Sequence, residues 1–253
     1  MSGHSKWSTI KRQKGANDAK RGALFTKLAR EIITAARQGG GDPEANYRLR
    51  MAVEKARASS MPAENIKRAI ERATGSGADA EQYDEVTYEG LGPGNVAVIV
   101  AAMTDNRNRT ASEIRSVFNK HGGSLSPVAW QFEQRGLISL PLSGRDPDEV
   151  TLAAIDAGAS DVGAPDAGSI LVTTEPAQLE AVRRALADAG YEAESAELSM
   201  EPTTVVAIGD EPSAKQVLNF LERLEDLDDV QNVYANFDIP ADLMERLEAQ
   251  VVG

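Results

Sequence analysis

Apolar residues recur at helical spacing near the beginning of the chain, from about residue 17 to residue 38. The members of this apolar stripe are Leu24, Phe25, Leu28, Ile32 and Ala36. Helical spacing assigns the basic residues to the opposite side, and these are Lys20, Lys27, Arg30 and Arg37. The pattern predicts an amphipathic helix with a basic outer face, which ends at the three glycines that follow.

Two further helices are expected before residue 76. Asp42 and Pro43 are typical of an N-cap and a first helical residue, and they predict a helix that runs to about residue 58. Pro62, followed by Glu64, predicts a third helix that ends near residue 75. The apolar residues expected to face inward are Leu49, Val53, Ile66 and Ile70. Together these segments predict a small three-helix domain, followed by a short linker at 75–78.

The pattern after this linker changes to alternating strands and helices. The continuous apolar run at 96–103 predicts a buried strand. Thr110 and Glu113 have the spacing of a capping box, and they predict a helix that reaches about residue 120. A further strand is expected at about 128–134. The glycine-rich stretch GLGPG at 90–94 is expected to be a turn between strands and not a phosphate loop, because it contains Pro and precedes no helix.

Six elements then follow in the order β-α-β-β-α-β, which is the ferredoxin-like order. They are strands at 137–142, 161–163, 169–174 and 192–199, with helices at 147–157 and 177–189. A strand at 203–208, a helix capped by Ser213 with Gln216, and a strand at 230–236 form another β-α-β set. Joined to the β-α-β set at 96–134, it would complete a second ferredoxin-like unit that is split by the first.

The predicted fold class is α+β and multidomain, with an N-terminal three-helix domain followed by two ferredoxin-like α/β domains, one inserted in the other. The predicted parts are a basic helical domain with an N-terminal arm at 1–78, a split α/β domain at 79–135 plus 202–238, an inserted domain at 136–201, and a C-terminal tail at 239–253. The alternation of elements also permits two sequential half-sheets.

The charge of the chain is divided sharply near residue 75. Residues 1–75 contain 16 Lys or Arg and 7 Asp or Glu, which gives a net charge of +9, whereas residues 76–253 contain 11 and 32, which gives −21. The formal total is −12. Such asymmetry is typical of a polyanion-binding segment joined to an acidic body, and the alternative is an uneven solubilising surface.

Composition excludes several classes of chemistry. The chain has no Cys and only two His, His4 and His121, so thiol and most imidazole chemistry is excluded. No nucleotide-binding or hydrolase motif is present, and the acidic run at 225–229 is more typical of a solvated turn than of a cation site. We therefore expect no enzymatic activity, no cofactor and no metal. The absence of an apolar run of about 18 residues and of a signal sequence predicts a cytoplasmic protein without a membrane partner.

The first candidate site is the basic arm SGHSKWSTIKRQKG at 2–15, continued by the first helix. Basic groups bind phosphates with release of counterions, and an indole can stack on an unpaired base. The residues expected to contact nucleic acid are Lys6, Trp7, Lys11, Arg12, Lys14, Lys20, Arg21, Lys27 and Arg30. In the alternative interpretation, Trp7 packs against the helical domain and the charges are merely solvated.

The second candidate site lies between the strand at 96–103 and the helix that follows it. It comprises Asn106, Arg107, Asn108 and Arg109. Free backbone N–H groups at a helix N-terminus beside two Arg form an anion site. Alternatively, the two Arg pair with acidic residues and fix the domains against each other. The sequence leaves both interpretations open.

Four segments resemble the YebC/PmpR family: GHSKWSTIKRQKGANDAKRGALFTKLAREI, YEGLGPGNVAVIV, MTDNRNRT and LEDLDDVQNVYANF. Together they extend from residue 3 to residue 237. The resemblance implies a cytoplasmic three-domain protein with a helical N-terminal domain and two α/β domains. It also implies a DNA-binding transcriptional regulator or, as in mitochondrial relatives, a translational activator, and no enzymatic reaction. The loop at Ser124–Pro127 differs from the glycine-rich stretch of the family.

We therefore expect a non-enzymatic nucleic-acid-binding regulator of gene expression. The target is either duplex DNA, as for a transcriptional regulator, or ribosomal or transfer RNA, with the ribosome as a further candidate partner. No helix-turn-helix or coiled-coil seam stands out, which favours RNA and a monomer, whereas the usual description of the family favours transcription. An enzyme acting on a nucleotide would need a catalytic constellation that is absent, and a pure protein adaptor would leave the arm without a role.

Overall fold

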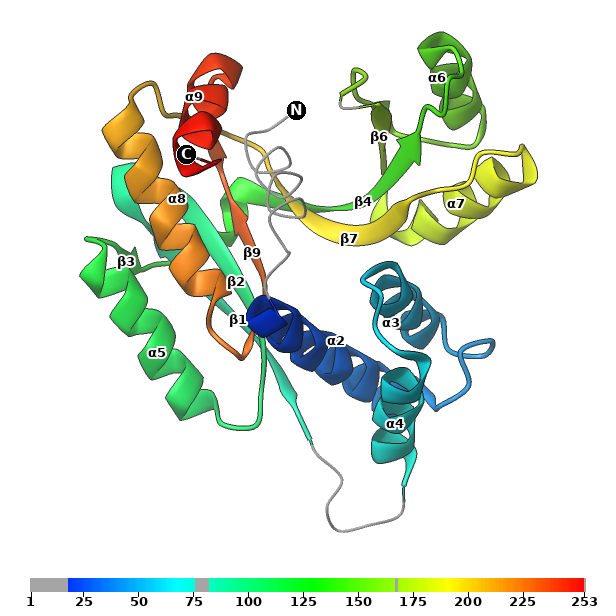
Figure 1. Ribbon diagram of the computed structural model, residues 1–253, viewed down its shortest axis with the longest axis horizontal. Coiled ribbons are helices and arrows are strands. Elements are labelled where there is room, and N and C mark those ends of the chain that lie inside the picture. Colours follow the sequence, from blue (N-terminus) through cyan, green and yellow to red (C-terminus); the bar gives the residue numbers. More distant parts are fainter. Residues whose placement is uncertain (1–17, 76–81, 167, 253) are drawn as a thin grey trace. The chain divides into compact units, whose positions relative to one another are not determined.

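The computed structural model describes residues 18–75, 82–166 and 168–252. Contacts divide the chain into two compact units. One unit contains residues 132–203, and the other contains the described residues before and after this segment. Each unit has its own four-stranded sheet. The helices between residues 18 and 74 precede both sheets along the chain (Figure 1).

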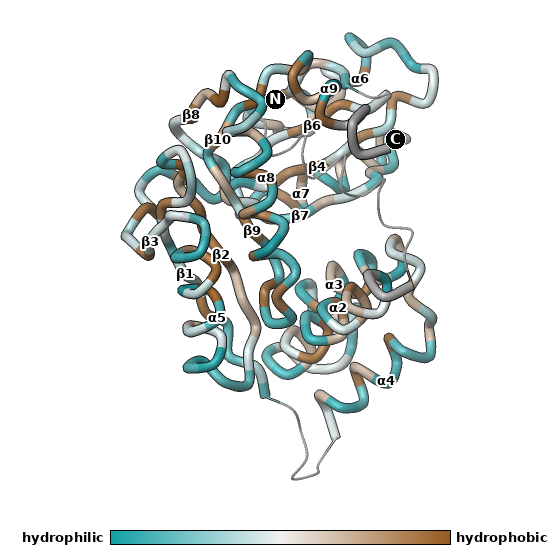
Figure 2. The backbone as a smooth tube through the Cα atoms, turned by 60° about the vertical axis from the view of Figure 1, so that its left-hand side comes forward, coloured by the Kyte–Doolittle hydropathy of each residue, from teal (hydrophilic) through white to brown (hydrophobic). Residues whose placement is uncertain are grey.

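The N-terminal region consists of three helices, as predicted: α2 (Asp18–Gly39), α3 (Tyr47–Ala58) and α4 (Ala63–Thr74). Leu28, Ile32, Leu49 and Ile66 belong to its core, whereas Leu24 is 43% exposed, so its assignment to the apolar stripe was wrong. Figure 2 shows alternating hydrophobic and hydrophilic positions along α4, the pattern of an amphipathic helix.

Asn46 forms the junction between α2 and α3. Its side-chain Nδ2 donates to the carbonyls of Ala35 and Gly40, both at 2.8 Å, and its Oδ1 accepts from the N–H of Leu49 at 3.1 Å. It is therefore the N-cap of α3. The predicted start at Asp42-Pro43 was wrong: the carboxylate of Asp42 accepts from a backbone N–H in the turn that precedes the helix.

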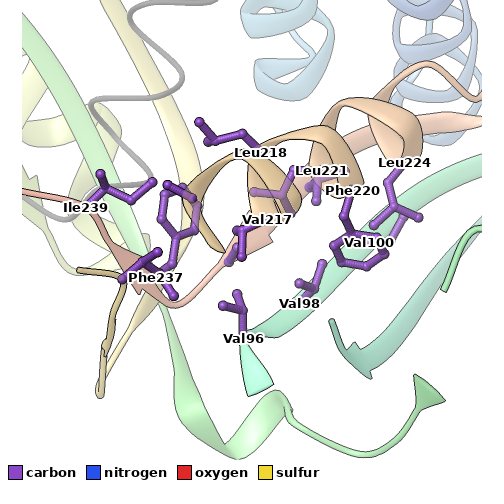
Figure 3. Packing of buried hydrophobic residues seen from close by; sticks show 14 of the residues in the cluster. Val96, Val98, Val100, Val217, Leu218, Phe220, Leu221, Leu224, Phe237 and Ile239 are labelled. Carbon is purple, nitrogen blue, oxygen red and sulfur yellow. The ribbon is translucent and has the colours of Figure 1, made fainter. Parts of the chain in front are cut away.

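The first sheet has the strand order β3-β1-β2-β9, with every neighbouring pair antiparallel. Its strands are β1 (Asp84–Leu91), β2 (Ala97–Thr104), β3 (Ser124–Leu125) and β9 (Val230–Ala235). Helices α5 (Arg107–Lys120) and α8 (Glu211–Glu225) cover one face of this sheet (Figure 1). Val98 and Val100 of β2 point toward Phe220 of α8 (Figure 3).

The glycines between β1 and β2 make room for two aromatic rings. A Cβ atom at Gly90 would lie 2.4 Å from the Phe118 ring, and one at Gly92 would lie 2.4 Å from the Phe220 ring. These two rings meet edge to face, with centroids 5.0 Å apart. Gly94 has φ +68°, a conformation that glycine adopts without strain. The stretch is therefore a packing turn between strands, as expected from its sequence.

Several elements of this region differ from the prediction. Strand β1 was implied by the turn predicted at 90–94 but was given no bounds, because its residues are mostly exposed or half-buried and give no apolar run. Residues 129–131 form a 3-10 turn and not a strand, and the predicted strand at 203–208 is reduced to β8 (Val206–Ala207), which pairs in parallel with β10 (Phe237–Asp238). The expected tail contains α9 (Ala241–Val252), whose Leu243, Met244 and Leu247 join the same core.

The predictions that Thr110 and Ser213 cap their helices were also wrong, because in each case an earlier residue accepts the hydrogen bond from the first turn. Asn106 caps α5, and Asp210 caps α8 by accepting from the N–H of Ser213 at 2.9 Å. Thr110 instead lies in the first turn of α5, where it is buried.

The unit at 132–203 has the ferredoxin-like order predicted for its elements. Its elements are β4 (Phe132–Pro141), α6 (Pro147–Asp156), β5 (Asp161–Val162), β6 (Ser169–Thr174), α7 (Leu179–Asp188) and β7 (Ser195–Pro202). The strands lie in the order β5-β6-β4-β7 and are antiparallel throughout. Ile138, Ile170 and Val172 of the sheet pack with Val150 of α6 and Leu186 of α7.

Candidate nucleic-acid interface

The residues of the arm lie outside the described part of the chain. They are Lys6, Trp7, Lys11, Arg12 and Lys14. The side chain of Lys20, at the start of α2, is also outside the part that the structure describes. Arg21 is exposed, and its guanidinium lies 5.7 Å from the centroid of the Phe25 ring. The nucleic-acid role of all these residues stays a prediction.

Lys27 and Arg30 of α2 do not point freely into solvent. The Lys27 Nζ donates to the Glu225 carbonyl at 2.5 Å, and the Arg30 guanidinium donates to the Asp228 carbonyl. Arg30 also forms an ion pair with Asp229, with an N–O distance of 3.1 Å, and only 15% of its side chain is exposed. These two predicted contact residues therefore attach α2 to the segment between α8 and β9.

A second set of contacts attaches the helical region to β1. Glu85 accepts from the Arg48 guanidinium at 2.8 Å and from the Gln38 side-chain amide at 2.9 Å. The hydrogen bond from Arg48 lowers the pKa of Glu85 more than its partial burial raises it. These contacts, together with those of Arg30, attach α2 and α3 to the α/β region that follows them in the chain.

Asp229 is the centre of the polar contacts at this end of the sheet. Its side chain is buried, and one carboxylate oxygen accepts from the Thr104 hydroxyl at 3.0 Å, the Thr110 hydroxyl at 2.6 Å and the Arg109 guanidinium at 2.7 Å. Arg30 pairs with the other oxygen. The expectation of a solvated acidic turn at 225–229 was therefore wrong for Asp229.

The ionisation of Asp229 is favoured by these partners. Burial alone would raise its pKa, but the hydrogen bonds from Thr110, Arg109 and Thr104 outweigh burial and lower the pKa. Removing a donor from a buried carboxylate is destabilising, because burial has already taken the carboxylate out of water. Asp229 therefore couples the helical region, through Arg30, to the N-terminus of α5, through Arg109 and Thr110.

The second predicted site, Asn106 to Arg109, is largely engaged by neighbouring acidic groups. Arg107 pairs with Asp84 at 2.9 Å, and Arg109 pairs with Asp105 and Asp229, both at 2.7 Å. Asn106 caps α5 by accepting from the Arg109 N–H at 3.1 Å, and Asn108 is exposed. The geometry therefore places both guanidinium groups on carboxylates of the same α/β region, and the anion-binding role of this segment stays a prediction.

Helices α3 and α4 also carry exposed basic groups, outside the predicted contact residues. They are Arg57, Lys67, Arg68 and Arg72. Arg57 and Lys67 line a shallow cleft between the two helices, whose floor includes Val53 and Ile66. Within the described residues, neither Arg57 nor Arg68 forms an ion pair. These residues were not predicted as contacts, because the arm and the face of α2 carry the denser basic pattern.

The turn that precedes β4 presents an exposed indole. Trp130 lies in the 3-10 turn Ala129–Gln131, and 76% of it is exposed. The carboxylate of Glu89 accepts from the backbone N–H groups of Val128 and Ala129, both at 2.7 Å. Trp130 was not predicted to contact nucleic acid, because it falls within the strand predicted at about 128–134.

Among residues 18–75, 82–166 and 168–252, no group of three or more Asp, Glu or His could hold a metal ion. Within the same ranges, no helix is both long and apolar enough to cross a membrane.

Comparison with protein families covers almost the whole chain. Residues 5–76 match the N-terminal domain of the TACO1/YebC protein, and residues 83–237 match the second and third domains of TACO1/YebC. The chain is a member of the TACO1/YebC family. The resemblance found in the sequence is thereby confirmed.

Full-length relatives of this TACO1/YebC member have a common description. The chain is 54% identical to a probable transcriptional regulatory protein of Rubrobacter xylanophilus, over the full length of both chains. It is also 54% identical to a protein of the same description from Chloroflexus aggregans, over 98% of this chain and all of the relative. Neither description is that of an enzyme.

A solved structure has the same fold. The crystal structure of a conserved hypothetical protein from Aquifex aeolicus matches with a TM-score of 0.80 and 48% sequence identity. The match covers 88% of this chain and 92% of the other. At this identity, the likeness supports a common arrangement of the elements described above.

Proposed function

We propose that this TACO1/YebC member is a non-enzymatic nucleic-acid-binding regulator of gene expression. The observation that carries the proposal is the separation of charge, with +9 at residues 1–75 and −21 at residues 76–253. A polyanion is attracted to the first segment and repelled by the second, so only one part of the chain is suited to phosphate contact. The description of the relatives as probable transcriptional regulatory proteins supports the same class of function.

Within this proposal, the phosphate contacts come from the arm and from α3 and α4. Arg57 and Arg68 are exposed and form no ion pair within the described residues, so binding a phosphate does not require them to give up a carboxylate. Lys27 and Arg30, in contrast, already donate to carbonyls of the α/β region. We assign them to the attachment of α2, which positions the arm and the exposed cations.

Duplex DNA is the first candidate target. The description of the relatives favours it, and the connection between α3 and α4 consists of residues 59–62, a length that suits a helix-turn-helix. Structured RNA, as bound by a translation factor, is the second candidate. The exposure of Trp130 favours it, because an unpaired base offers the face on which an indole stacks.

Binding across a salt series tests the proposal. The full chain and a chain without residues 1–16 are titrated with duplex DNA, transfer RNA and ribosomal particles. We expect binding to at least one target, a weaker affinity as salt rises, and a smaller salt slope without the arm, by about 0.7 to 0.9 for each phosphate that the arm neutralises. The Lys215→Ala/Arg223→Ala variant, which removes exposed cations from α8, is the matched control and should keep the full slope.

The three targets distinguish the two candidates. Preference for particular duplex sequences supports a transcriptional regulator. Preference for transfer RNA or ribosomal particles at physiological salt supports a translation factor. Absence of binding to all three targets, or binding that does not depend on salt, would overturn the proposal.

A further inference from the structure

The turn that carries Trp130 is held at both of its ends. At its beginning, one oxygen of Glu89 accepts from the N–H groups of Val128 and Ala129. At its end, the Gln131 side-chain oxygen accepts from the side chain of Asn236 at 3.0 Å. Asn236 is buried and also accepts from the backbone N–H of Ala97 at 2.7 Å, so it is fixed to the sheet.

This arrangement fixes the backbone while it leaves the indole in solvent. A large aromatic ring that is 76% exposed gains little from burial in the chain's own core. Two polar anchors on either side of the ring hold the turn in one conformation. A ligand that binds the ring therefore meets a preorganised surface, which lowers the entropic cost of binding.

The segment that leads into this turn is also less acidic along the sequence than the rest of residues 76–253. From Ile114 to Gln131 the sequence contains Arg115 and Lys120 and no carboxylate. Glu89 is the carboxylate bonded to the turn, and the two N–H groups that it accepts offset its charge. A polyanion therefore meets less repulsion at this segment than over the rest of residues 76–253.

We infer that Trp130 is a base-stacking residue, which binds an unpaired nucleobase of the nucleic acid whose phosphates contact the helical region. The inference rests on the proposed function and extends it, because it assigns a contact to the α/β region. The ligand is an unpaired base, and either single-stranded DNA or a loop of RNA supplies one. Glu89 is a positioning residue that holds the turn through its two hydrogen bonds.

Binding of short single strands tests the role of Trp130. The probes are an oligouridine and an oligodeoxythymidine of about 12 nucleotides and a duplex of similar length, titrated into the full chain. We expect Trp130→Ala to weaken binding of the single strands about tenfold, Trp130→Phe to retain most of the affinity, and duplex binding to stay unchanged. The control is Leu152→Ala on α6, which removes an apolar side chain of comparable exposure, 62%.

Intrinsic fluorescence provides a second measurement that a merely structural role would not change. The chain contains two Trp, so Trp7→Phe leaves Trp130 as the only indole. Stacking of a base on this indole should quench its emission as a single strand binds. The Glu89→Ala variant should reduce both quenching and affinity, whereas Glu89→Gln, which keeps an acceptor oxygen, should restore most of both.

The outcomes separate this inference from the proposed function. If the full chain binds nucleic acid with the expected salt dependence, but Trp130→Ala binds single strands as tightly and the emission of Trp130 does not change, the stacking role is wrong and the proposed function stands. If the full chain binds none of the probes and none of the larger targets, both are wrong. A stronger effect with one oligonucleotide identifies RNA or DNA as the source of the base.

Discussion

Arg30 of α2 carries the same guanidinium group as Arg57 of α3 and Arg68 of α4, but its surroundings differ from theirs. Arg30 is 15% exposed and contacts Asp229 and the Asp228 carbonyl, whereas Arg57 and Arg68 are exposed and form no ion pair within the described residues. A guanidinium that is already bound to a carboxylate would have to leave it to bind a phosphate. The density of basic residues in a sequence therefore does not by itself locate a phosphate-binding surface.

The largest effect expected from this comparison is on stability, at Asp229. In Asp229→Asn, the Arg30 and Arg109 guanidinium groups lose a buried carboxylate, and one of the hydroxyl donors loses its acceptor. We expect the free energy of unfolding to fall by about 3 kcal/mol, measured by urea denaturation. Asp226→Asn, at an exposed neighbouring carboxylate, should change it by less than about 0.5 kcal/mol.

The pH dependence of stability provides a check on this prediction. Because folding lowers the pKa of Asp229, its contribution to stability is complete above about pH 4, the ordinary value for Asp, and is lost as the pH falls through the lowered pKa. Between neutral pH and acid, the wild-type chain should therefore lose more stability than Asp229→Asn. Equal losses in the two chains would show that the charge of Asp229 does not stabilise the fold.

A smaller effect is expected at Arg30 itself. Arg30→Gln removes the ion pair with Asp229 and at least one of the hydrogen bonds that attach α2. We expect a loss of about 1 to 2 kcal/mol in the free energy of unfolding, smaller than that of Asp229→Asn, since Arg109, Thr104 and Thr110 still donate to the other carboxylate oxygen. The matched variant Arg57→Gln should stay within about 0.5 kcal/mol of wild type. If Arg57→Gln were the more destabilising of the two, the distinction between attached and exposed cations would be wrong.

The sequence predicted the regular parts of the fold well. The ferredoxin-like order at 132–203 follows from short apolar strands that alternate with helices, and its observed elements match that order. The bounds of β1 were not predicted, because most residues from Asp84 to Leu91 are exposed or half-buried and the strand is defined by its pairing with β2. Its partner β2 begins only six residues after β1 ends, as the second strand of an antiparallel hairpin, but the residues of β1 carry no apolar pattern of their own.

The candidate site was harder to predict, because its contacts join residues that are far apart in the sequence. Arg30 and Asp229 are far apart in the sequence, and only the fold brings them together. Thr110 has the spacing of a helix cap, but the buried Asp229 carboxylate takes its hydroxyl, and Asn106 caps the helix instead. The exposure of Trp130 depends on a turn held by Glu89, from a distant strand. Local patterns identified residue types suited to nucleic acid, and tertiary contacts decided which of them stay exposed.

The most direct test of the account is the salt dependence of nucleic-acid binding in two variants of the full chain. Arg57→Gln/Arg68→Gln removes two exposed cations, and Lys27→Gln/Arg30→Gln removes two that are bound to carbonyls. We predict that the slope of log affinity against log salt falls by about 1.4 to 1.8 in the first variant and by less than about 0.5 in the second, measured where both are folded. A large fall in the second variant with an unchanged slope in the first would contradict the account.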